Sequence, residues 1–523
     1  MRREELVRQL EQYSGTWDIC IIGGGASGLG IAVDAASRGY KTVLLEKYDF
    51  AKGTSSRSTK LVHGGVRYLQ QGNIKLVMDA LKERGIMKKN APHLVKNQSF
   101  IVPNYKWWEG PFYGLGLKVY DWMSGSLGLG ASQWLSTEEV LEHAPTLDPE
   151  GLRGGVMYHD GQFDDSRLAL NLAQTAIEQG AVVLNYFDVT SFIKTGNDIA
   201  GVIVNDTINN KSFEIKSKVV INATGVFSDS IQQLDEPGKE STITPSQGIH
   251  IVLDKAFLPG TSAIMIPHTD DGRVLFAVPW HQKIIVGTTD TLIDDILSEP
   301  LAREDEIEFL ITHAARYLTK DPSIDDVRSI YSGLRPLVKN SAKKTAEISR
   351  DHSIIISDSG LVSIVGGKWT TYRKMAEDTV NTAAVQARLP YKDCITTDLS
   401  IHGGKSHGTE TGTNYYYGSD IPLIEELMVS DNSLRALIHE RLPYRKAEII
   451  WAVKNEMCMT VEDALSRRTR ALLLDAAAAV EAAPLVARMM AEEMKYDQHW
   501  IDQQLKEFHA IAASYLPKKI VHP

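Results

Sequence analysis

Residues 17–46 read WDICIIGGGASGLGIAVDAASRGYKTVLLE and contain the clearest fold signal in this chain. WDICII is a short apolar run that ends in glycines, and the residues after it carry apolar side chains at helical spacing as far as Gly39. KTVLLE is a second apolar run with an acid at its end. This order predicts a strand, a helix and a second, parallel strand. Such a βαβ unit is the building block of a doubly wound α/β sheet.

The glycines of this stretch indicate a dinucleotide site. Gly23, Gly25 and Gly28 have the spacing G-x-G-x-x-G between the predicted strand and helix, and Glu46 ends the next strand. The first glycine permits a tight turn, the second lets a pyrophosphate approach the backbone, and the third lets the helix pack on the strand. Glu46 is expected to accept hydrogen bonds from a ribose. This motif by itself does not distinguish FAD from NAD.

A hydroxyl-rich stretch follows, TSSRSTKLVHGGVRYLQ, residues 54–70. Hydroxyls and glycines beside cations are typical of a phosphate site, because small donors and bare backbone can approach an oxyanion. Thr54, Ser55, Ser56 and Ser58 come soon after the ribose-binding acid. FAD is the longer cofactor and needs donors there for its pyrophosphate and ribityl chain, so the position of these hydroxyls favours FAD.

The rest of the chain predicts three parts. NLAQTAIEQG with AVVLNYFDV, and later KVVINATG, read as a helix and strands of the first sheet, which IIISDSGLVSIVGG and the helix in TTYRKMAEDTVNTAAVQ complete. Between residues 243 and 290 the short apolar stretches lack helices between them, which predicts an antiparallel sheet with a turn at His281 and Gln282. We therefore expect a Rossmann-like FAD-binding domain over 1–400, interleaved with a substrate domain over roughly 90–150 and 241–335. A Gly, Ser and Thr-rich linker, residues 400–420, leads into a C-terminal helical domain, 401–523.

Composition narrows the class of protein. Of 523 residues 43% are apolar and 23% charged, as in soluble globular proteins, and the net charge of −10 counts against nucleic-acid binding. Three distant cysteines without a CxxC pair predict neither a disulfide framework nor a zinc site, and we expect no metal. The apolar segment ALLLDAAAAVEAAPLVARMM is interrupted by Asp475, Glu481 and Pro484, so it predicts a packed helix rather than a membrane span.

Several motifs together resemble one known family. CIIGGGASGLG through HGGVRYLQ, then VINATGVFSD, SQGIHIVL, VPWHQKIIVGTTDT, YSGLRPLV, ISRDHSI and GGKWTTYRKMAEDT, resemble the FAD-dependent glycerol-3-phosphate dehydrogenases. The resemblance runs from about residue 17 to 385, and TVEDALSRRTRALLLD extends it toward the C-terminus. It implies oxidation of sn-glycerol 3-phosphate to dihydroxyacetone phosphate by hydride transfer to flavin N5, with electrons passed to a membrane quinone. The mitochondrial branch carries EF-hands, but this sequence has no D-x-D-x-D-G loop, so calcium control is not implied.

The resemblance also implies site residues. Arg335 and Arg350 match the family's substrate-site arginines, and a planar guanidinium suits a phosphate dianion. His250 stands in the alternating strand GIHIVLD, where Ile249 and Ile251 should face away from it, and it is the favoured base. Arg335 is its rival for lowering the pKa of the substrate hydroxyl, while Lys368 is expected to stabilise developing negative charge. The expected catalytic residues are His250, Arg335 and Lys368, and the expected substrate-binding residues are these three with Arg67, Tyr68 and Arg350.

The expected cofactor contacts lie in four segments. They are Gly23, Gly25, Ala26, Ser27, Gly28 and Glu46; Thr54, Ser55, Ser56, Ser58, His63, Gly64 and Gly65; Val189, Ala223, Thr224 and Gly225; and Gly367, Lys368, Trp369 and Thr370.

The segment YKWWEGPFYGLGLKVYDWM, residues 105–123, is rich in aromatics with flanking lysines. Such a composition suits a membrane interface, although aromatics also pack cores. The start, MRREELVRQLEQ, has neither an apolar core nor the acid-poor composition of a transit peptide. We therefore expect a cytoplasmic protein held peripherally at the inner face of the plasma membrane. The sequence does not determine the oligomeric state, and a homodimer is compatible with it.

Three other functions remain open. A glycerol-3-phosphate oxidase shares the same reductive chemistry but uses oxygen, and usually carries an insertion that this sequence lacks. An amine or 2-hydroxy-acid oxidising flavoenzyme would have the same fold, but several arginines at substrate positions favour a phosphate over a single carboxylate. A flavin-containing RNA-modifying or scaffold protein is opposed by the acidic charge.

Overall fold

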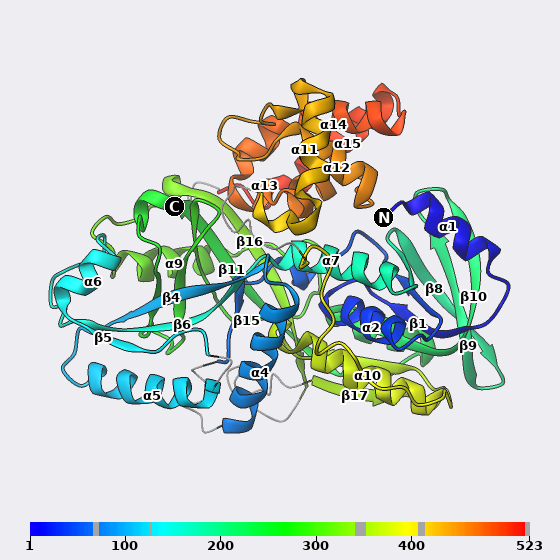
Figure 1. Ribbon diagram of the computed structural model, residues 1–523, viewed down its shortest axis with the longest axis horizontal. Coiled ribbons are helices and arrows are strands. Elements are labelled where there is room, and N and C mark those ends of the chain that lie inside the picture. Colours follow the sequence, from blue (N-terminus) through cyan, green and yellow to red (C-terminus); the bar gives the residue numbers. More distant parts are fainter. Residues whose placement is uncertain (66–72, 126–127, 340–351, 406–413, 518–523) are drawn as a thin grey trace.

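The chain builds two β-sheets side by side, with a group of C-terminal helices lying across them at the top of Figure 1. The computed structural model describes residues 1–65, 73–125, 128–339, 352–405 and 414–517, and the statements below concern these ranges.

The first sheet is doubly wound, as predicted. Its described strands are β1 (Trp17–Ile22), β2 (Thr42–Leu45), β7 (Val182–Leu184), β8 (Phe187–Thr195), β9 (Asp198–Asp206), β10 (Lys211–Asn222), β17 (His352–Ile356) and β18 (Val362–Gly366). The strands run in the order β17-β18-β10-β1-β2-β7, and β18, β10, β1, β2 and β7 pair in parallel. The strand order reverses beside β1, which is where doubly wound sheets bind their ligands.

One segment that was predicted as a single strand forms two strands in the structure. AVVLNYFDV breaks at Tyr186, whose φ of 60° is left-handed and turns the chain out of the sheet. The first half, β7, pairs with β2, whereas the second half, β8, starts an antiparallel meander with β9 and β10. The turn is held because the Tyr186 N–H donates to the carbonyl of Tyr48 at 2.9 Å.

Helices cover the first sheet. They are α1 (Arg3–Gln12), α2 (Ala26–Ser37), α7 (Asp165–Glu178), α8 (Ser228–Asp235) and α10 (Tyr372–Gln386). The central helix α2 packs against both α7 and α10. Its Gly30 makes the second contact close, since a Cβ there would lie 2.8 Å from the Tyr372 ring. The helix predicted to begin after the late glycine pair is α10, so that prediction is confirmed.

The second sheet is mostly antiparallel, as predicted for residues 243–290. Its described strands are β3 (Leu61–Val62), β4 (Val95–Pro103), β5 (Gln133–Leu135), β6 (Gly155–Phe163), β11 (Ile243–Asp254), β12 (Ala263–Ile266), β13 (Leu275–Trp280), β14 (Lys283–Gly287), β15 (Thr291–Leu292) and β16 (Val327–Val338). β13 and β14 form the expected hairpin, and its turn residues His281 and Gln282 both have positive φ, as tight hairpin turns require. β12 and β4 pair in parallel. β6 and β3 belong to this sheet although they lie outside the ranges predicted for a substrate domain, whose boundaries stay a prediction.

The remaining helices are α4 (Ile74–Asn90), α5 (Glu109–Ser124), α6 (Thr137–His143) and α9 (Glu304–Ala315) around the second sheet, and α11 (Ile421–Ser430), α12 (Lys446–Asn455), α13 (Ala471–Leu474), α14 (Ala476–Met494) and α15 (Gln498–Ala512) at the C-terminal end. The predicted C-terminal helical domain is thus present. Asp475 splits its apolar segment into α13 and α14, because its carboxylate caps α14 by accepting from the Ala478 N–H at 2.9 Å. Within the described residues, no helix combines the length and apolar character that crossing a bilayer requires.

Candidate active site

The glycine turn between β1 and α2 lines a cavity of about 800 Å³. Gly23 has a φ of 108°, and a Cβ there would lie 2.7 Å from the carbonyl oxygen of Ala223. A Cβ on Gly28 would collide with the carbonyl of Gly23, so this glycine permits the close packing that the motif predicts. Both glycines let α2 present its N-terminus to the cavity, and a helix N-terminus favours an anion.

Glu46 follows β2 directly and lines the same cavity. Its carboxylate accepts from the Gly24 N–H at 2.5 Å and from the Tyr48 N–H at 2.8 Å. Burial raises the pKa of Glu46 above its usual range. A carboxylate has about four acceptor positions, so two remain for a hydroxyl pair such as that of a ribose.

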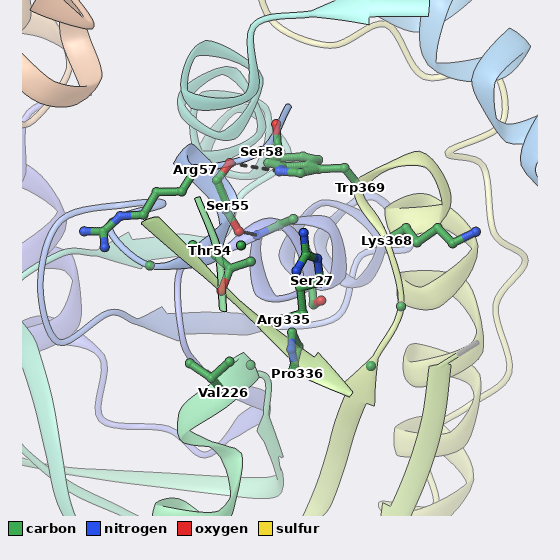
Figure 2. A pocket seen from close by; sticks show the side chains of 18 of the residues that line it. Ser27, Thr54, Ser55, Arg57, Ser58, Val226, Arg335, Pro336, Lys368 and Trp369 are labelled. Atoms are coloured by element: carbon green, nitrogen blue, oxygen red, sulfur yellow. Dashed lines mark hydrogen bonds between the residues drawn. The ribbon is translucent and has the colours of Figure 1, made fainter. Parts of the chain in front are cut away.

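The hydroxyl-rich loop uses most of its hydroxyls to hold itself in place. Thr54 donates to the carbonyl of Leu334 at 2.5 Å, and Ser58 donates to Asp165 at 2.7 Å. Ser55 accepts from the Ala26 N–H at 2.9 Å and so joins the loop to the first turn of α2. Figure 2 shows this loop beside Ser27 and Trp369, whose indole N–H donates to the Ser55 carbonyl at 2.9 Å. The loop therefore presents a preformed wall.

Most of the expected cofactor contacts line this one cavity. Its lining includes Gly23, Gly25, Ala26, Ser27, Glu46, Thr54, Ser55, Ser58, His63, Gly65, Val189, Ala223, Thr224, Gly225, Gly367, Lys368, Trp369 and Thr370.

Three of the expected contacts, Gly28, Ser56 and Gly64, are not among the lining residues. Ser56 is buried, and its hydroxyl is directed at the Gly53 carbonyl, 3.5 Å away. Gly64 is packed against Leu81 and donates its N–H to the Tyr120 hydroxyl at 2.8 Å. Ser56 and Gly64 stand next to lining residues in the sequence, which is why they were expected to contact the cofactor. The turns of the loop direct them into the protein instead.

A buried ion pair beneath the loop was not predicted. Lys60 is fully buried with a φ of 63°, and its ammonium lies 2.8 and 2.7 Å from the two carboxylate oxygens of Asp165. The same ammonium donates to the Ser56 carbonyl at 2.7 Å. Burial lowers the pKa of Lys60, and the charge of Asp165 opposes that effect. Lys60 and Asp165 are 105 positions apart in the sequence, so no local pattern could have predicted their pairing.

His250 lies on β11 and faces the cavity, while Ile249 and Ile251 point into an apolar core, as the alternation predicted. Its Nε2 is 2.8 Å from the Thr59 hydroxyl oxygen, and its Nδ1 is buried without a hydrogen-bond partner among the described residues. Burial lowers the pKa of His250 well below its usual range, and the charges of Arg335 and Lys60 lower it further. The imidazole is therefore neutral at physiological pH and available as a proton acceptor.

Arg335 lies on β16 beside His250, and its guanidinium borders the cavity. It donates to the Thr288 hydroxyl at 3.1 Å and to the Thr289 carbonyl at 3.0 Å, and lies 3.3 Å from a carboxylate oxygen of Asp290. Gly248 makes room for it, because a Cβ there would collide with the guanidinium. Gly287 makes room for the imidazole of His250 in the same way. Neither of these two glycines was singled out from the sequence.

Lys368 also borders the cavity, but in Figure 2 its side chain extends away from Arg335. Arg67, Tyr68 and Arg350 lie outside the described residues. Their expected roles, and that of Lys368, stay predictions.

Comparison with known proteins decides the family. The sequence of residues 18–373 matches the protein family described as FAD dependent oxidoreductase. Residues 362–500 match the family described as the C-terminal domain of alpha-glycerophosphate oxidase. The mitochondrial glycerol-3-phosphate dehydrogenase of Macaca fascicularis is 39% identical over 95% of this chain and 73% of its own length. The chain belongs to the FAD-dependent glycerol-3-phosphate dehydrogenases.

Solved structures agree with this glycerol-3-phosphate dehydrogenase fold. The enzyme from Bacillus halodurans, complexed with FAD, matches with a TM-score of 0.81 and 29% identity, over 100% of this chain and 99% of its own. The L-alpha-glycerophosphate oxidase of Mycoplasma pneumoniae, with FAD bound, matches at a TM-score of 0.56 and 19% identity, over 74% of this chain and 98% of its own. The second likeness concerns the fold alone.

Membership of the family confirms the prediction of FAD, and the cavity of this glycerol-3-phosphate dehydrogenase fits that cofactor. The bare glycine turn and the N-terminus of α2 would hold the pyrophosphate, and Glu46 the adenosine ribose. Thr54, Trp369, His250 and Arg335 line the same cavity as the glycine turn, so the expected cofactor and substrate groups share one space.

Proposed function

We propose that this dehydrogenase oxidises sn-glycerol 3-phosphate to dihydroxyacetone phosphate and passes the electrons to a membrane quinone. The observation that carries the substrate assignment is the pair His250 and Arg335, a neutral imidazole and a guanidinium on adjacent strands, which line the same cavity as the dinucleotide turn. FAD, when bound, supplies the acceptor for the hydride that leaves C2 of the substrate.

The residues around the substrate have separate tasks. Arg335 binds the phosphate, and its contacts with Thr288, Thr289 and Asp290 fix its direction before the substrate arrives. A ring nitrogen of His250 takes the proton of the C2 hydroxyl as the carbonyl forms. Arg67, Tyr68 and Arg350 are proposed as further phosphate contacts, and Lys368 as a group that stabilises negative charge.

The first experiment mixes the purified, FAD-loaded protein with sn-glycerol 3-phosphate without oxygen and follows the flavin absorbance. Rapid bleaching is expected. Arg335→Ala should weaken substrate binding by about two orders of magnitude, since a charged hydrogen-bonded pair is lost. Absence of bleaching in a folded, FAD-loaded protein would overturn the substrate assignment. Adding quinone or air to the bleached protein then separates a dehydrogenase from the alternative, an oxidase.

We also propose that α5 rests on the membrane that holds the quinone. The apolar side chains exposed on α5 and just before it are Trp107, Trp108, Phe112, Leu115, Val119 and Trp122. Tyr113 and Tyr120 of the same segment are buried, so the aromatics divide between a core face and an outer face. An outer apolar face with lysines beside it suits an anionic lipid surface. The membrane is expected to be the inner face of the plasma membrane.

Sedimentation with vesicles that contain anionic phospholipid tests the membrane proposal. Trp107 and Trp122 are 80% and 82% exposed, and replacing both with serine should reduce the bound fraction severalfold. Val385→Ser is the matched control, because Val385 is 81% exposed on α10. Equal binding by the wild type and the double variant would contradict attachment through α5.

A further inference from the structure

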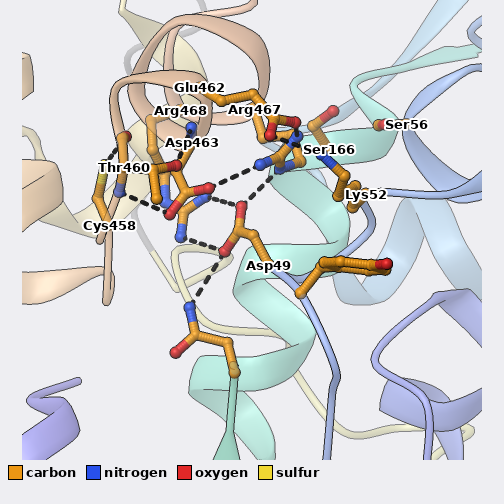
Figure 3. Close-up of polar contacts among 12 residues, drawn as sticks. Asp49, Lys52, Ser56, Ser166, Cys458, Thr460, Glu462, Asp463, Arg467 and Arg468 are labelled. Atoms are coloured by element: carbon orange, nitrogen blue, oxygen red, sulfur yellow. Dashed lines mark hydrogen bonds and ion pairs between the residues drawn. The ribbon is translucent and has the colours of Figure 1, made fainter. Parts of the chain in front are cut away.

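The loop between β2 and the hydroxyl-rich stretch, residues 47–53, has two faces. Tyr48, Lys52 and Gly53 line the cofactor cavity. Asp49 points the other way and is fully buried against the C-terminal helices. Its carboxylate accepts from Arg467 Nε at 2.6 Å and from two nitrogens of Arg468 at 2.7 and 2.9 Å (Figure 3). One carboxylate of the cofactor loop is thus held by two adjacent arginines from the far end of the chain.

A second contact joins the same parts. Arg467 also donates to Glu462 at 2.7 Å, and Glu462 in turn accepts from the ammonium of Lys52 at 2.6 Å. Lys52 lies 3.3 Å from Glu299, which pairs with Arg57 at 2.8 Å. Alternating charges therefore run without a break from the C-terminal helices, through the loop, to a second cavity-lining residue, Arg57.

The loop needs support of this kind. Ala51 has a φ of 60°, which a residue with a Cβ adopts only when its surroundings hold it there. Its N–H donates at 2.9 Å to the carbonyl of Gly24, the middle residue of the glycine turn. The loop thus braces the turn that is expected to hold the pyrophosphate, while Asp49 and Lys52 on either side of Ala51 are tied to the C-terminal helices.

We propose that Arg467 and Arg468 are positioning residues for the cofactor, through which the C-terminal helical domain holds loop 47–53 in the shape that binds FAD. The proposal rests on FAD binding in this cavity. Neither arginine is among the residues that line the cavity, so their effect passes through Asp49, Glu462 and Lys52. Burying this many charges is costly unless all are paired, so a tertiary geometry that keeps them paired is strongly preferred over looser ones.

The test measures the dissociation constant of FAD for the apoprotein by flavin fluorescence, together with the melting temperature of each apoprotein. Arg467→Met and Glu462→Gln should each weaken FAD binding by about tenfold or more, a usual size for coupling between distant sites. Arg470→Met is the matched control. Arg470 is equally buried, and its Nε lies 3.0 Å from a carboxylate oxygen of Asp164. Its other polar and ring partners among the described residues are the Arg468 carbonyl, Tyr416 and Tyr444, none of which belongs to loop 47–53. This control should lower the melting temperature but leave FAD affinity within about threefold of the wild type.

Glu462→Gln keeps the side-chain volume and tests the proposal even where Arg467→Met does not fold. Unchanged FAD affinity in Glu462→Gln, or equal weakening in the Arg470→Met control, would overturn it. Failure of the wild-type apoprotein to bind FAD would instead defeat the cofactor assignment, so the two failures are distinguishable. Linkage adds a second measurement: FAD should slow amide exchange in residues 462–468 more than in α14.

Discussion

The imidazole of His250 stacks on the ring of Tyr331, with the centroids 4.6 Å apart and the planes at 10°. The Tyr331 hydroxyl donates to the Ser58 carbonyl at 3.0 Å, and the Thr59 hydroxyl lies 2.8 Å from His250 Nε2. The proposed base is therefore held on its face by Tyr331 of β16 and at its edge by Thr59. Both contacts connect it to the hydroxyl-rich loop, which the ion pair of Lys60 and Asp165 anchors.

The contact between Thr59 and His250 is expected to set the orientation of the base. Thr59→Val keeps the shape but removes the hydroxyl, and should slow substrate-driven flavin reduction by about tenfold, the effect of about 1.4 kcal/mol on a barrier. Thr59→Ser retains a hydroxyl and serves as the control, with a much smaller loss. Stopped-flow absorbance measures both rates. Equal rates in the valine variant and the wild type would show that the hydrogen bond has no such role.

The protonation of His250 predicts a pH profile. Burial, with the charges of Arg335 and Lys60, lowers the pKa of His250 well below its usual range, so the imidazole stays neutral as the pH falls below the ordinary value. The rate of flavin reduction should therefore not fall between about pH 8 and about pH 6, where an ordinary histidine with a pKa near 6.5 would become protonated. A rate that halves near pH 6.5 would contradict a buried, neutral base at this position.

Removing Lys60 should destabilise the fold. Lys60→Met leaves Asp165 buried without its cation, and breaking a buried pair in this way costs about 3–5 kcal/mol of unfolding free energy. The double variant Lys60→Met, Asp165→Asn removes both charges and should recover part of that loss. Denaturant unfolding of the apoproteins measures both. A double variant less stable than Lys60→Met would show that the charge left on Asp165 is not the cause.

The ion pairs of His402 should make the free energy of unfolding fall in alkaline solution. Burial lowers the pKa of His402, but the carboxylates of Asp420, 3.0 Å from Nε2, and Glu178 outweigh it and raise that pKa to about 9. Because the pKa is raised in the folded state, the ion pairs of protonated His402 contribute fully to the free energy of unfolding below about pH 6.5. This contribution is lost as the pH rises through about 9.

His402→Gln should therefore cost about 1–2 kcal/mol at pH 6, discounted for the exposure of Glu178, and little at pH 10. Denaturant unfolding at the two pH values measures the difference. His499→Gln on α15, where the histidine is exposed, is the control and should change stability by less than about 0.5 kcal/mol at either pH. An equal loss for His402→Gln at both pH values would assign the effect to packing.

Local sequence patterns were sufficient to predict much of the fold. The glycine spacing before an apolar helix predicted the turn between β1 and α2, because only glycine tolerates the φ of Gly23 and the close packing at Gly28. The alternation GIHIVLD predicted which way His250 faces, because successive side chains of a strand point to opposite sides. The resemblance to the family indicated the substrate and identified which arginines are expected to bind it.

The sheet types and the dinucleotide turn could be predicted from the amino-acid sequence, since each depends on neighbours within a few positions, and the resemblance of several motifs to one family indicated the class of chemistry. The folded chain was needed to show that Ser56 and Gly64 turn away from the cavity and that a predicted strand is divided at Tyr186. It also showed that Asp49 meets Arg468, 419 positions later. Buried ion pairs of this kind form because unpaired charges cannot be left in the interior, and that requirement leaves no periodic signature in the chain.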